Sequence, residues 1–327
     1  MGKSNQITVV GAGFMGGVIA PVYAQHGYEV VLHDADPEVL ASFAARARPI
    51  VASLIPAGPQ ADAAITKLID SIRLEQDLAT AVAGSFLVHE VIPEQLPLKQ
   101  ALFEQLDGLC PADVVLGTNT SSFRLTDICS GVQHRERVVG IHYITPAHIV
   151  KAVEVIVTDF TPPELVEWTR QFLASIDHVA IVCKESPGFL VNRLQAAMVA
   201  EAHRVVDEGL ASPQDIDNMM RLSLAPRWAL WGLLATEDLV VNKRTVHASM
   251  RYMSDMPNFA HFGGTALLDK MIDAGQEGAI SGQGWYRWDD GYDAIVTERD
   301  HQMSQLLEWL DQRDAMATIG IKEEGAS

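Results

Sequence analysis

The feature that most constrains the fold is a glycine-rich turn within residues 6–17, QITVVGAGFMGG. A short β-branched run ends at Gly11, and helix-forming and apolar residues follow from Phe14 to Gln25. Gly11 permits a tight turn, Gly13 leaves room for a pyrophosphate, and Gly16 lets the helix pack closely on the strand. The start of this helix would offer free N–H groups and its positive dipole end to phosphate groups.

A second predicted strand, residues 29–33, ends at Asp34. An acidic residue about 20 positions after the glycine turn is expected to hydrogen-bond the adenosine ribose hydroxyls. Its charge would repel the 2′-phosphate of NADP, so the pattern predicts an NAD site. The same glycines would also persist in a Rossmann-type domain that had lost its ligand. Asp36, which precedes Pro37, is more typical of a helix N-cap.

Composition limits the class of protein. The chain has 327 residues, of which 48% are apolar, so it can bury the cores of two domains. The formal charge of −18 argues against nucleic acid and anionic membrane surfaces as partners. We expect no signal peptide, and no apolar run reaches the ~18 residues of a membrane span. Three scattered cysteines without a CxxC pattern predict a reduced, cytoplasmic chain with no disulfide framework and no metal site.

Predicted strands and helices alternate up to residue 185. This order predicts an α/β fold with a Rossmann-type, doubly wound and mainly parallel sheet. After the break at 186–188 almost every segment is helical, so we expect an NAD-binding domain over 1–185 and an all-helical domain over 186–327. Helices this apolar favour a homodimer through the helical domain. The later strands are expected at 85–91, 114–117, 138–143, 152–157 and 178–182, and the helices of the second domain at 189–208, 228–253, 266–274 and 298–311.

One insertion is longer than a minimal crossover between strands. Helical patterns over 37–54 and 60–69 flank the breaking sequence Ile-Pro-Ala-Gly-Pro at 55–59. These segments predict a helical hairpin that projects from the first domain, or a simple cap on its sheet.

Polar residues mark the predicted strand ends where ligands bind in such sheets. His142 lies where strand 138–143 leaves the sheet, and Glu154 is an isolated acid in the apolar strand that follows. A buried acid needs a partner, and a His–Glu pair suits a general base. A structural salt bridge, or a solvent-facing Glu154, is the alternative. Ser121 could bind a substrate oxygen or only stabilise a turn, and Asn192 could reach the site or only cap a helix.

Several stretches in the same order resemble the L-3-hydroxyacyl-CoA dehydrogenase family over about residues 6–288. They are GAGFMGG with Asp34, HEVIPEQLPLKQ (89–100), TNTSS (118–122), GIHYITPAHIVKAVEVI (140–156), SPGFLVNR (186–193), ASPQDIDNMM (211–220) and GQGWYRW (282–288).

The resemblance implies a Rossmann-type domain followed by a helical dimerisation domain, and it implies roles for single residues. His142 matches the catalytic base and Glu154 the acid that orients it. Ser121 matches the serine that bonds the substrate oxygen, and Asn192 the asparagine near the reacting carbonyl. The residues expected to bind NAD are Gly11, Gly13, Phe14, Met15, Gly16, Asp34, Glu94 and Lys99.

Two departures from the acyl-CoA enzymes concern the substrate. Those enzymes usually follow the catalytic histidine with Phe-Asn-Pro, whereas Tyr-Ile-Thr-Pro stands at 143–146. They also carry a Met-Gly-Pro-Phe type of turn, whereas Leu-Ala-Pro-Arg-Trp stands at 224–228. The latter is closer to the branch that acts on small free hydroxy acids, L-gulonate 3-dehydrogenase (lambda-crystallin) and carnitine dehydrogenase. Arg227 is therefore a candidate to bind a substrate carboxylate; a surface or interface arginine is the alternative.

The sequence thus predicts an NAD-dependent dehydrogenase that interconverts a 3-hydroxy acid and its 3-keto form, with a small free acid favoured. An acyl-CoA thioester is the second candidate, because the hairpin resembles the CoA-contacting extension of the family and carries Arg46, Arg48 and Lys67. These cations could equally form a solvated face. The alternative from another class is a non-catalytic NAD-binding protein of the crystallin kind.

Overall fold

The computed structural model describes residues 5–240, 242–257 and 259–312. Contacts within the chain divide it into two compact units, one up to Met198 and one from Val199 onward. The division falls inside helix α9 (Val191–Asp207). The boundary expected near Glu185 lies earlier, just after the last strand of the first unit, β8 (Val179–Lys184).

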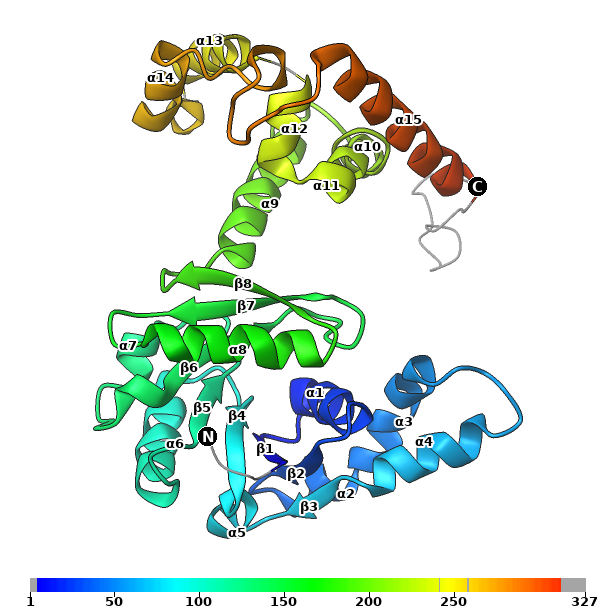
Figure 1. The fold of residues 1–327 in the computed structure, drawn as a ribbon, viewed down its shortest axis with the longest axis vertical. Helices are drawn as coiled ribbons and strands as arrows, with labels where there is room; N and C mark the ends of the chain where they lie inside the picture. Colours follow the sequence, from blue (N-terminus) through cyan, green and yellow to red (C-terminus); the bar gives the residue numbers. More distant parts are fainter. Residues whose placement is uncertain (1–4, 241, 258, 313–327) are drawn as a thin grey trace. The chain divides into compact units, whose positions relative to one another are not determined.

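The first unit is built on an eight-stranded sheet in the described part of the chain, in the order β3-β2-β1-β4-β5-β6-β7-β8 (Figure 1). All neighbours pair in parallel except β6 and β7, which are antiparallel, so the predicted mainly parallel sheet is confirmed. The other strands are β1 (Gln6–Val10), β2 (Glu29–His33), β3 (Arg73–Glu75), β4 (Ser85–Glu90), β5 (Val115–Thr118), β6 (Val138–Tyr143) and β7 (Ala152–Val157).

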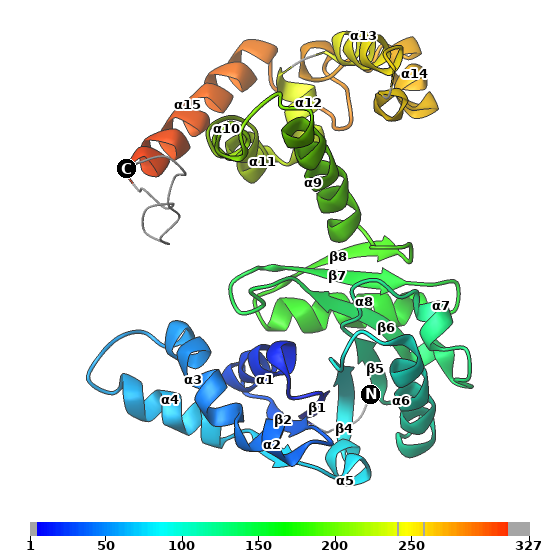
Figure 2. The same ribbon diagram turned by 180° about the vertical axis from the view of Figure 1, so that it is seen from behind.

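Helices cover both faces of this sheet. Figures 1 and 2 show α8 in front of the strands in one view and behind them in the other. One buried cluster joins the sheet to α1, α3, α4 and α8, and a second joins it to α6 and α7. The central strands are therefore buried on both sides, as their continuous apolar sequences require. The helices are α1 (Phe14–Gln25), α2 (Pro37–Ala41), α3 (Phe43–Leu54), α4 (Ala61–Asp70), α5 (Leu78–Val82), α6 (Leu96–Leu109), α7 (Leu125–Ile128) and α8 (Pro163–Ser175).

Most predicted boundaries hold to within a few residues, and the differences have local causes. The helix expected over 37–54 is divided at Ser42, and Asp36 caps its first part by accepting from the Glu38 N–H at 2.8 Å. The three-residue strand β3 was not predicted, because it is too short to show a pattern of alternating polarity. The hairpin is present, with α3 and α4 packed together beside α1.

The described part of the second unit is helical, as predicted. The helical stretch expected over 228–253 consists of three helices, because Gly232 takes a positive φ of 81° that ends the first of them. The helices after α9 are α10 (Pro213–Met219), α11 (Ala225–Trp231), α12 (Leu233–Val240), α13 (Lys243–Ser254), α14 (Ala266–Asp273) and α15 (Tyr292–Asp311). In the described residues no helix combines the length and the apolar character that crossing a membrane demands.

The GQGWYRW segment has a structural role inside this unit. The buried carboxylate of Asp238 accepts from the N–H groups of Trp285 (3.1 Å) and Tyr286 (3.0 Å) and from the indole of Trp288 (3.0 Å). Lys243, fully buried, pairs with the same carboxylate. The segment is thus folded around one buried ion pair.

Candidate active site

Two neighbouring strands bring the predicted histidine and glutamate together. β6 and β7 pair antiparallel with His142 opposite Glu154, which places the two side chains on the same face of the sheet. His142 Nδ1 lies 2.7 Å from Glu154 Oε2, and both side chains are buried. The isolated acid in an apolar strand therefore has the partner that the sequence predicted.

The second oxygen of Glu154 holds the start of helix α9. Oε1 accepts from the N–H groups of Leu190 (2.9 Å) and Val191 (2.8 Å). Burial by itself would raise the pKa of Glu154, but the hydrogen bonds from His142 and these two N–H groups outweigh it and lower the pKa below its usual range. The carboxylate is therefore ionised at neutral pH, where it accepts the Nδ1 proton of His142 and leaves Nε2 with a free lone pair.

A strained turn delivers these two N–H groups. Gly188 has a φ of 73° and Phe189, which is not a glycine, has a φ of 49°. Phe189 is buried, and its ring meets the His142 ring edge to face at 5.8 Å between centroids. Positive φ at a bulky residue costs free energy and persists where the surroundings impose it. Here the buried ring and the carboxylate of Glu154 impose it.

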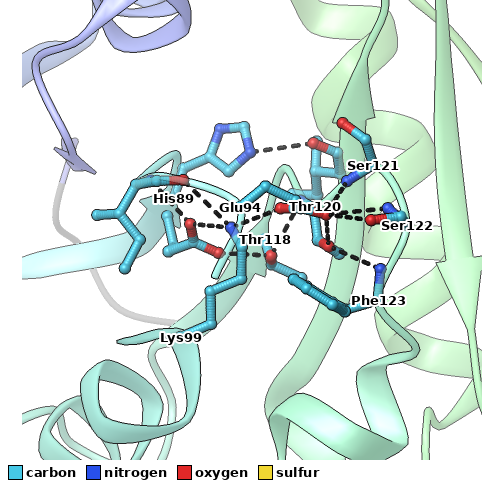
Figure 3. A network of polar contacts seen from close by, with 11 residues as sticks. His89, Glu94, Lys99, Thr118, Thr120, Ser121, Ser122 and Phe123 are labelled. Carbon is cyan, nitrogen blue, oxygen red and sulfur yellow. Dashed lines mark hydrogen bonds and ion pairs between the residues drawn. The ribbon is translucent and has the colours of Figure 1, made fainter. Parts of the chain in front are cut away.

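The loop after β5 that carries Ser121 and Ser122, here called the serine loop, is held in place by Glu94. A single oxygen, Oε1, accepts four hydrogen bonds, from Thr120 Oγ1 (2.7 Å), Ser121 N (2.9 Å), Ser122 N (3.0 Å) and Ser122 Oγ (2.9 Å) (Figure 3). The hydroxyl of Ser121 makes no hydrogen bond within the described residues, so it is available to a ligand. Glu94 thus fixes the backbone that presents Ser121.

Lys99 connects this loop to the sheet. Its ammonium group, 1% exposed, lies 2.6 Å from Glu90 Oε1 and 3.2 Å from Glu94 Oε2. The other oxygen of Glu90 accepts from Thr118 Oγ1 at 2.6 Å. Glu90 is fully buried and was not predicted from the sequence. The signal was present, because an acid at the end of an apolar strand resembles the pattern that singled out Glu154.

Asn192 joins the two halves of the site. Its Nδ2 donates to the carbonyl of Ser121 at 2.9 Å, and the residue before it, Val191, donates to Glu154. A continuous polar network thus runs from Lys99 to His142. All of its members belong to the first compact unit. Arg227, on α11 of the second unit, hydrogen-bonds Ser223 Oγ at 2.7 Å.

The glycine turn has the shape that a dinucleotide needs. A Cβ on Gly16 would lie 1.8 Å from the carbonyl oxygen of Gly11, so a side chain is excluded there. A Cβ on Gly13 would meet nothing within 4 Å, which leaves its backbone open to a pyrophosphate. Phe14, in the first turn of α1, is 69% exposed.

Asp34 stands beside this turn. Its Oδ2 accepts from the Ala12 N–H at 2.8 Å and its Oδ1 from the Asp36 N–H at 3.0 Å. Each carboxylate oxygen retains a lone pair, so the pair of ribose hydroxyls of NAD fits here. The residues present therefore suit the adenosine and pyrophosphate ends of NAD.

The hairpin arginines are engaged within the first unit. Arg46 Nη2 donates to Ala12 O (2.7 Å) and Val39 O (2.9 Å), and its Nη1 donates to Gly13 O (3.2 Å). Arg48 pairs with Asp62 at 3.0 Å. Arg46, on α3, therefore stabilises the dinucleotide turn by hydrogen bonds to its backbone, a role that the sequence did not predict.

Comparison with known families agrees with this geometry. Residues 6–186 match the model of the 3-hydroxyacyl-CoA dehydrogenase NAD binding domain, and residues 188–288 match that of the 3-hydroxyacyl-CoA dehydrogenase C-terminal domain. The chain belongs to the 3-hydroxyacyl-CoA dehydrogenase family. It is an NAD-dependent dehydrogenase that acts on a CH–OH group, and the non-catalytic alternative is not retained.

The sequences of relatives in this family align with most of this chain. The mitochondrial hydroxyacyl-coenzyme A dehydrogenase of Homo sapiens is 32% identical, over 86% of this chain and 90% of its own length. A probable 3-hydroxybutyryl-CoA dehydrogenase of Bacillus subtilis is 30% identical, over 87% and 98%. The crystal structure of a 3-hydroxyacyl-CoA dehydrogenase from Archaeoglobus fulgidus superposes with a TM-score of 0.78 at 25% identity, covering 94% of this chain and 99% of that one.

Another similar structure is named for a different kind of substrate. It is a 5-dehydrogenase of a hydroxylated pyridine carboxylic acid, described as an NAD⁺-dependent dismutase. Its TM-score is 0.66 at 25% identity, and it covers 95% of this chain and 100% of that one.

Replacement of Glu94 tests whether the serine loop depends on it. Glu94→Ala removes one acceptor of four hydrogen bonds, and we expect kcat/KM for the ketone to fall about 10²-fold, as a small misplacement of a substrate-binding group does. Glu94→Gln supplies an amide oxygen as the acceptor in place of the carboxylate oxygen, and the fall in kcat/KM should stay within about tenfold. Glu164→Ala, at an exposed glutamate of α8, is the matched control. Equal activity of the Ala and Gln variants would contradict this role.

Proposed function

We propose that this enzyme interconverts 3-hydroxy acids and 3-keto acids with NAD, and that His142 and Glu154 form its acid–base pair. The observation that carries the proposal is the 2.7 Å contact between His142 Nδ1 and a carboxylate whose other oxygen holds the start of α9. This arrangement fixes both the tautomer and the orientation of the imidazole. His142 Nε2 is then the atom that exchanges a proton with the substrate.

Four residues of the network take part directly in this reaction: His142, Glu154, Ser121 and Asn192. His142 Nε2 takes the proton of the substrate hydroxyl while the hydrogen on the same carbon leaves as hydride, and Glu154 stabilises the imidazolium that results. When bound, NAD supplies the hydride acceptor. The hydroxyl of Ser121 donates a hydrogen bond to the substrate oxygen. One N–H of the Asn192 amide donates to the carbonyl of Ser121, and its second N–H donates to the substrate oxygen. The reverse reaction returns the proton from His142 to the ketone oxygen.

His142→Ala should lower kcat by ~10²–10⁴, the usual contribution of a general base. The Kd of NADH, measured by fluorescence titration, should change little. His134→Ala, at an exposed histidine, is the control. The pKa of Glu154 lies below the usual range of a glutamate. This carboxylate therefore stays ionised as the pH falls from neutral, and it takes up a proton only below that range. Protonation of Glu154 should therefore make no contribution to the pH dependence of the oxidation rate near neutral pH. Near-normal turnover of His142→Ala would rule out this mechanism.

A small free hydroxy acid is the substrate class that we favour. The hairpin resembles a CoA-contacting extension, yet Arg46 is turned onto the carbonyls of Ala12 and Gly13, and Arg48 is neutralised by Asp62. Two of its three cations are thus committed to contacts within the chain. The pyridine carboxylate dehydrogenase supports this choice, because the substrate in its name is a free acid. A CoA thioester is the second candidate, and the names of the human and Bacillus subtilis relatives favour it.

Arg227 is our candidate for the substrate carboxylate. Its hydrogen-bonding partner, Ser223, is neutral, and no carboxylate pairs with it in the described residues. A guanidinium group can bind a carboxylate through two parallel hydrogen bonds, which would distinguish a free acid from a thioester.

A panel of free 3-keto acids and acetoacetyl-CoA, each tested for NADH oxidation, separates the two candidates. We expect a higher kcat/KM on a free acid. Arg227→Met should then raise the KM of that acid about tenfold or more, which corresponds to ~1.4 kcal/mol of lost binding, with the KM of NADH unchanged. Arg221→Met, at a second arginine of the same unit, is the control. Turnover on the thioester alone, with no effect of Arg227→Met, would reject the free-acid proposal.

We also propose that the enzyme is a homodimer. Helix α9 has 17 residues and buries none of them, and its apolar side chains Leu194, Met198, Val199 and Val206 are 41–45% exposed. Such a face favours a second protein surface. Sedimentation velocity should give a dimer, and Met198→Glu should shift it toward monomer, whereas Gln195→Glu on the same helix should not. A monomeric wild type at micromolar concentration would refute this proposal.

A further inference from the structure

Strand β5 stops beside β6 before β6 itself ends. The parallel pairing of the two strands runs only as far as Thr118 opposite Gly140, whereas β6 continues to Tyr143. The chain after Thr118 turns away into the serine loop. The last residues of β6, which include His142, thus lack strand β5 as a neighbour. A buried strand edge without partners is costly, because each backbone polar group must be satisfied.

Two side chains take the place of the missing strand. His89 Nε2 lies 3.0 Å from the carbonyl oxygen of Ile141, and Asn119 Oδ1 accepts from the Tyr143 N–H at 2.8 Å. Backbone groups two residues apart on a strand point to the same side, so both bonds lie on the edge that β5 has left. They flank His142 on either side in the sequence.

The ring of His89 is held in one protonation state and one tautomer. It is fully buried on β4, and its Nδ1 lies 2.8 Å from the hydroxyl of Tyr23. Burial lowers the pKa of His89 to about 3, so the ring is neutral at working pH. The Tyr143 hydroxyl donates to that of Tyr23 at 3.4 Å, which leaves the Tyr23 proton for His89 Nδ1. Nε2 therefore carries the hydrogen that His89 donates to Ile141.

A glycine makes room for this bond. A Cβ on Gly117 of β5 would lie 3.3 Å from His89 Cδ2 and 3.0 Å from Ile141 Cδ1, tighter than ordinary contacts. Figure 3 shows His89 near the Glu94–Lys99 contacts, with a dashed line for the hydrogen bond that its ring makes. The same buried position also ties β4 to α1, the helix that follows the dinucleotide turn.

We propose that His89 and Asn119 are positioning residues that replace strand β5 beyond Thr118 and hold the end of β6, and with it His142, in its working place. This inference rests on the proposed role of His142 as the base. The consequence is that the sheet opens between β5 and β6 beside His142, where the serine loop diverges, without leaving the edge of β6 unbonded.

The test compares His89→Leu with His89→Gln, because a glutamine amide offers one donor and one acceptor, as the neutral ring does. We expect His89→Leu to lower kcat about 10- to 100-fold, with the Kd of NADH within about twofold of wild type. His89→Gln should recover kcat to within about fivefold. His178→Leu is the control, because His178 is buried against the ring of Tyr143 and bonds the carbonyls of Ile176 and Ala147 instead. It should lower the Tm but not kcat.

Two further measurements keep the inference testable if His89→Leu does not fold. Asn119→Ala removes the other bond and should also lower kcat at constant Kd for NADH. Nitrogen-15 NMR of histidine side chains should show His89 protonated at Nε2 and not at Nδ1 from pH 5 to 9.

An Nδ1–H tautomer of His89 would overturn the inference. So would unchanged kcat in both His89→Leu and Asn119→Ala, or a fall of kcat and NADH affinity together. An inactive wild type, or an active His142→Ala variant, would instead refute the proposed function, so the two failures are distinguishable.

Discussion

The buried carboxylate of Glu154 is the interaction on which the site depends. A charge in an apolar strand is tolerated only when hydrogen bonds replace its lost hydration. His142 bonds one oxygen of this carboxylate, and the N–H groups of Leu190 and Val191, at the positive end of α9, bond the other. The requirement to satisfy one charge therefore sets the histidine tautomer and the place where the long helix begins.

A similar requirement shapes the other half of the site. Glu90 and Glu94 converge on the buried Lys99, and Glu94 then gathers the serine loop with a single oxygen. Buried ion pairs contribute little net stability, because desolvation offsets their attraction. They fix the positions of the side chains instead, because moving one partner away would leave the other as an unpaired buried charge. Both halves of the site follow this principle, and Asn192 connects them.

Sequence patterns located much of this site and failed in specific ways. The isolated acid in an apolar strand identified Glu154, and its partner His142 followed from the end of the preceding strand. Glu90, which ends β4, carries the same kind of signal, yet the sequence does not show that Lys99 and Thr118 converge on it. Arg46 was expected on a solvent-facing or ligand-binding surface, because a sequence does not show which way a long side chain turns. In the structure it binds the backbone carbonyls of the dinucleotide turn.

The sequence by itself determined the strand–turn–helix unit of the NAD site and the alternation that makes the sheet, and it singled out His142 and Glu154 as a candidate pair. These depend on local sterics, on the period of apolar residues and on the cost of burying a charge, all of which can be read along the chain. Only the tertiary structure decided the antiparallel pairing that sets His142 opposite Glu154, the four bonds to Glu94, and the substitution of His89 and Asn119 for a strand. These contacts join residues far apart in the sequence, and their geometry depends on how strands and helices pack in three dimensions.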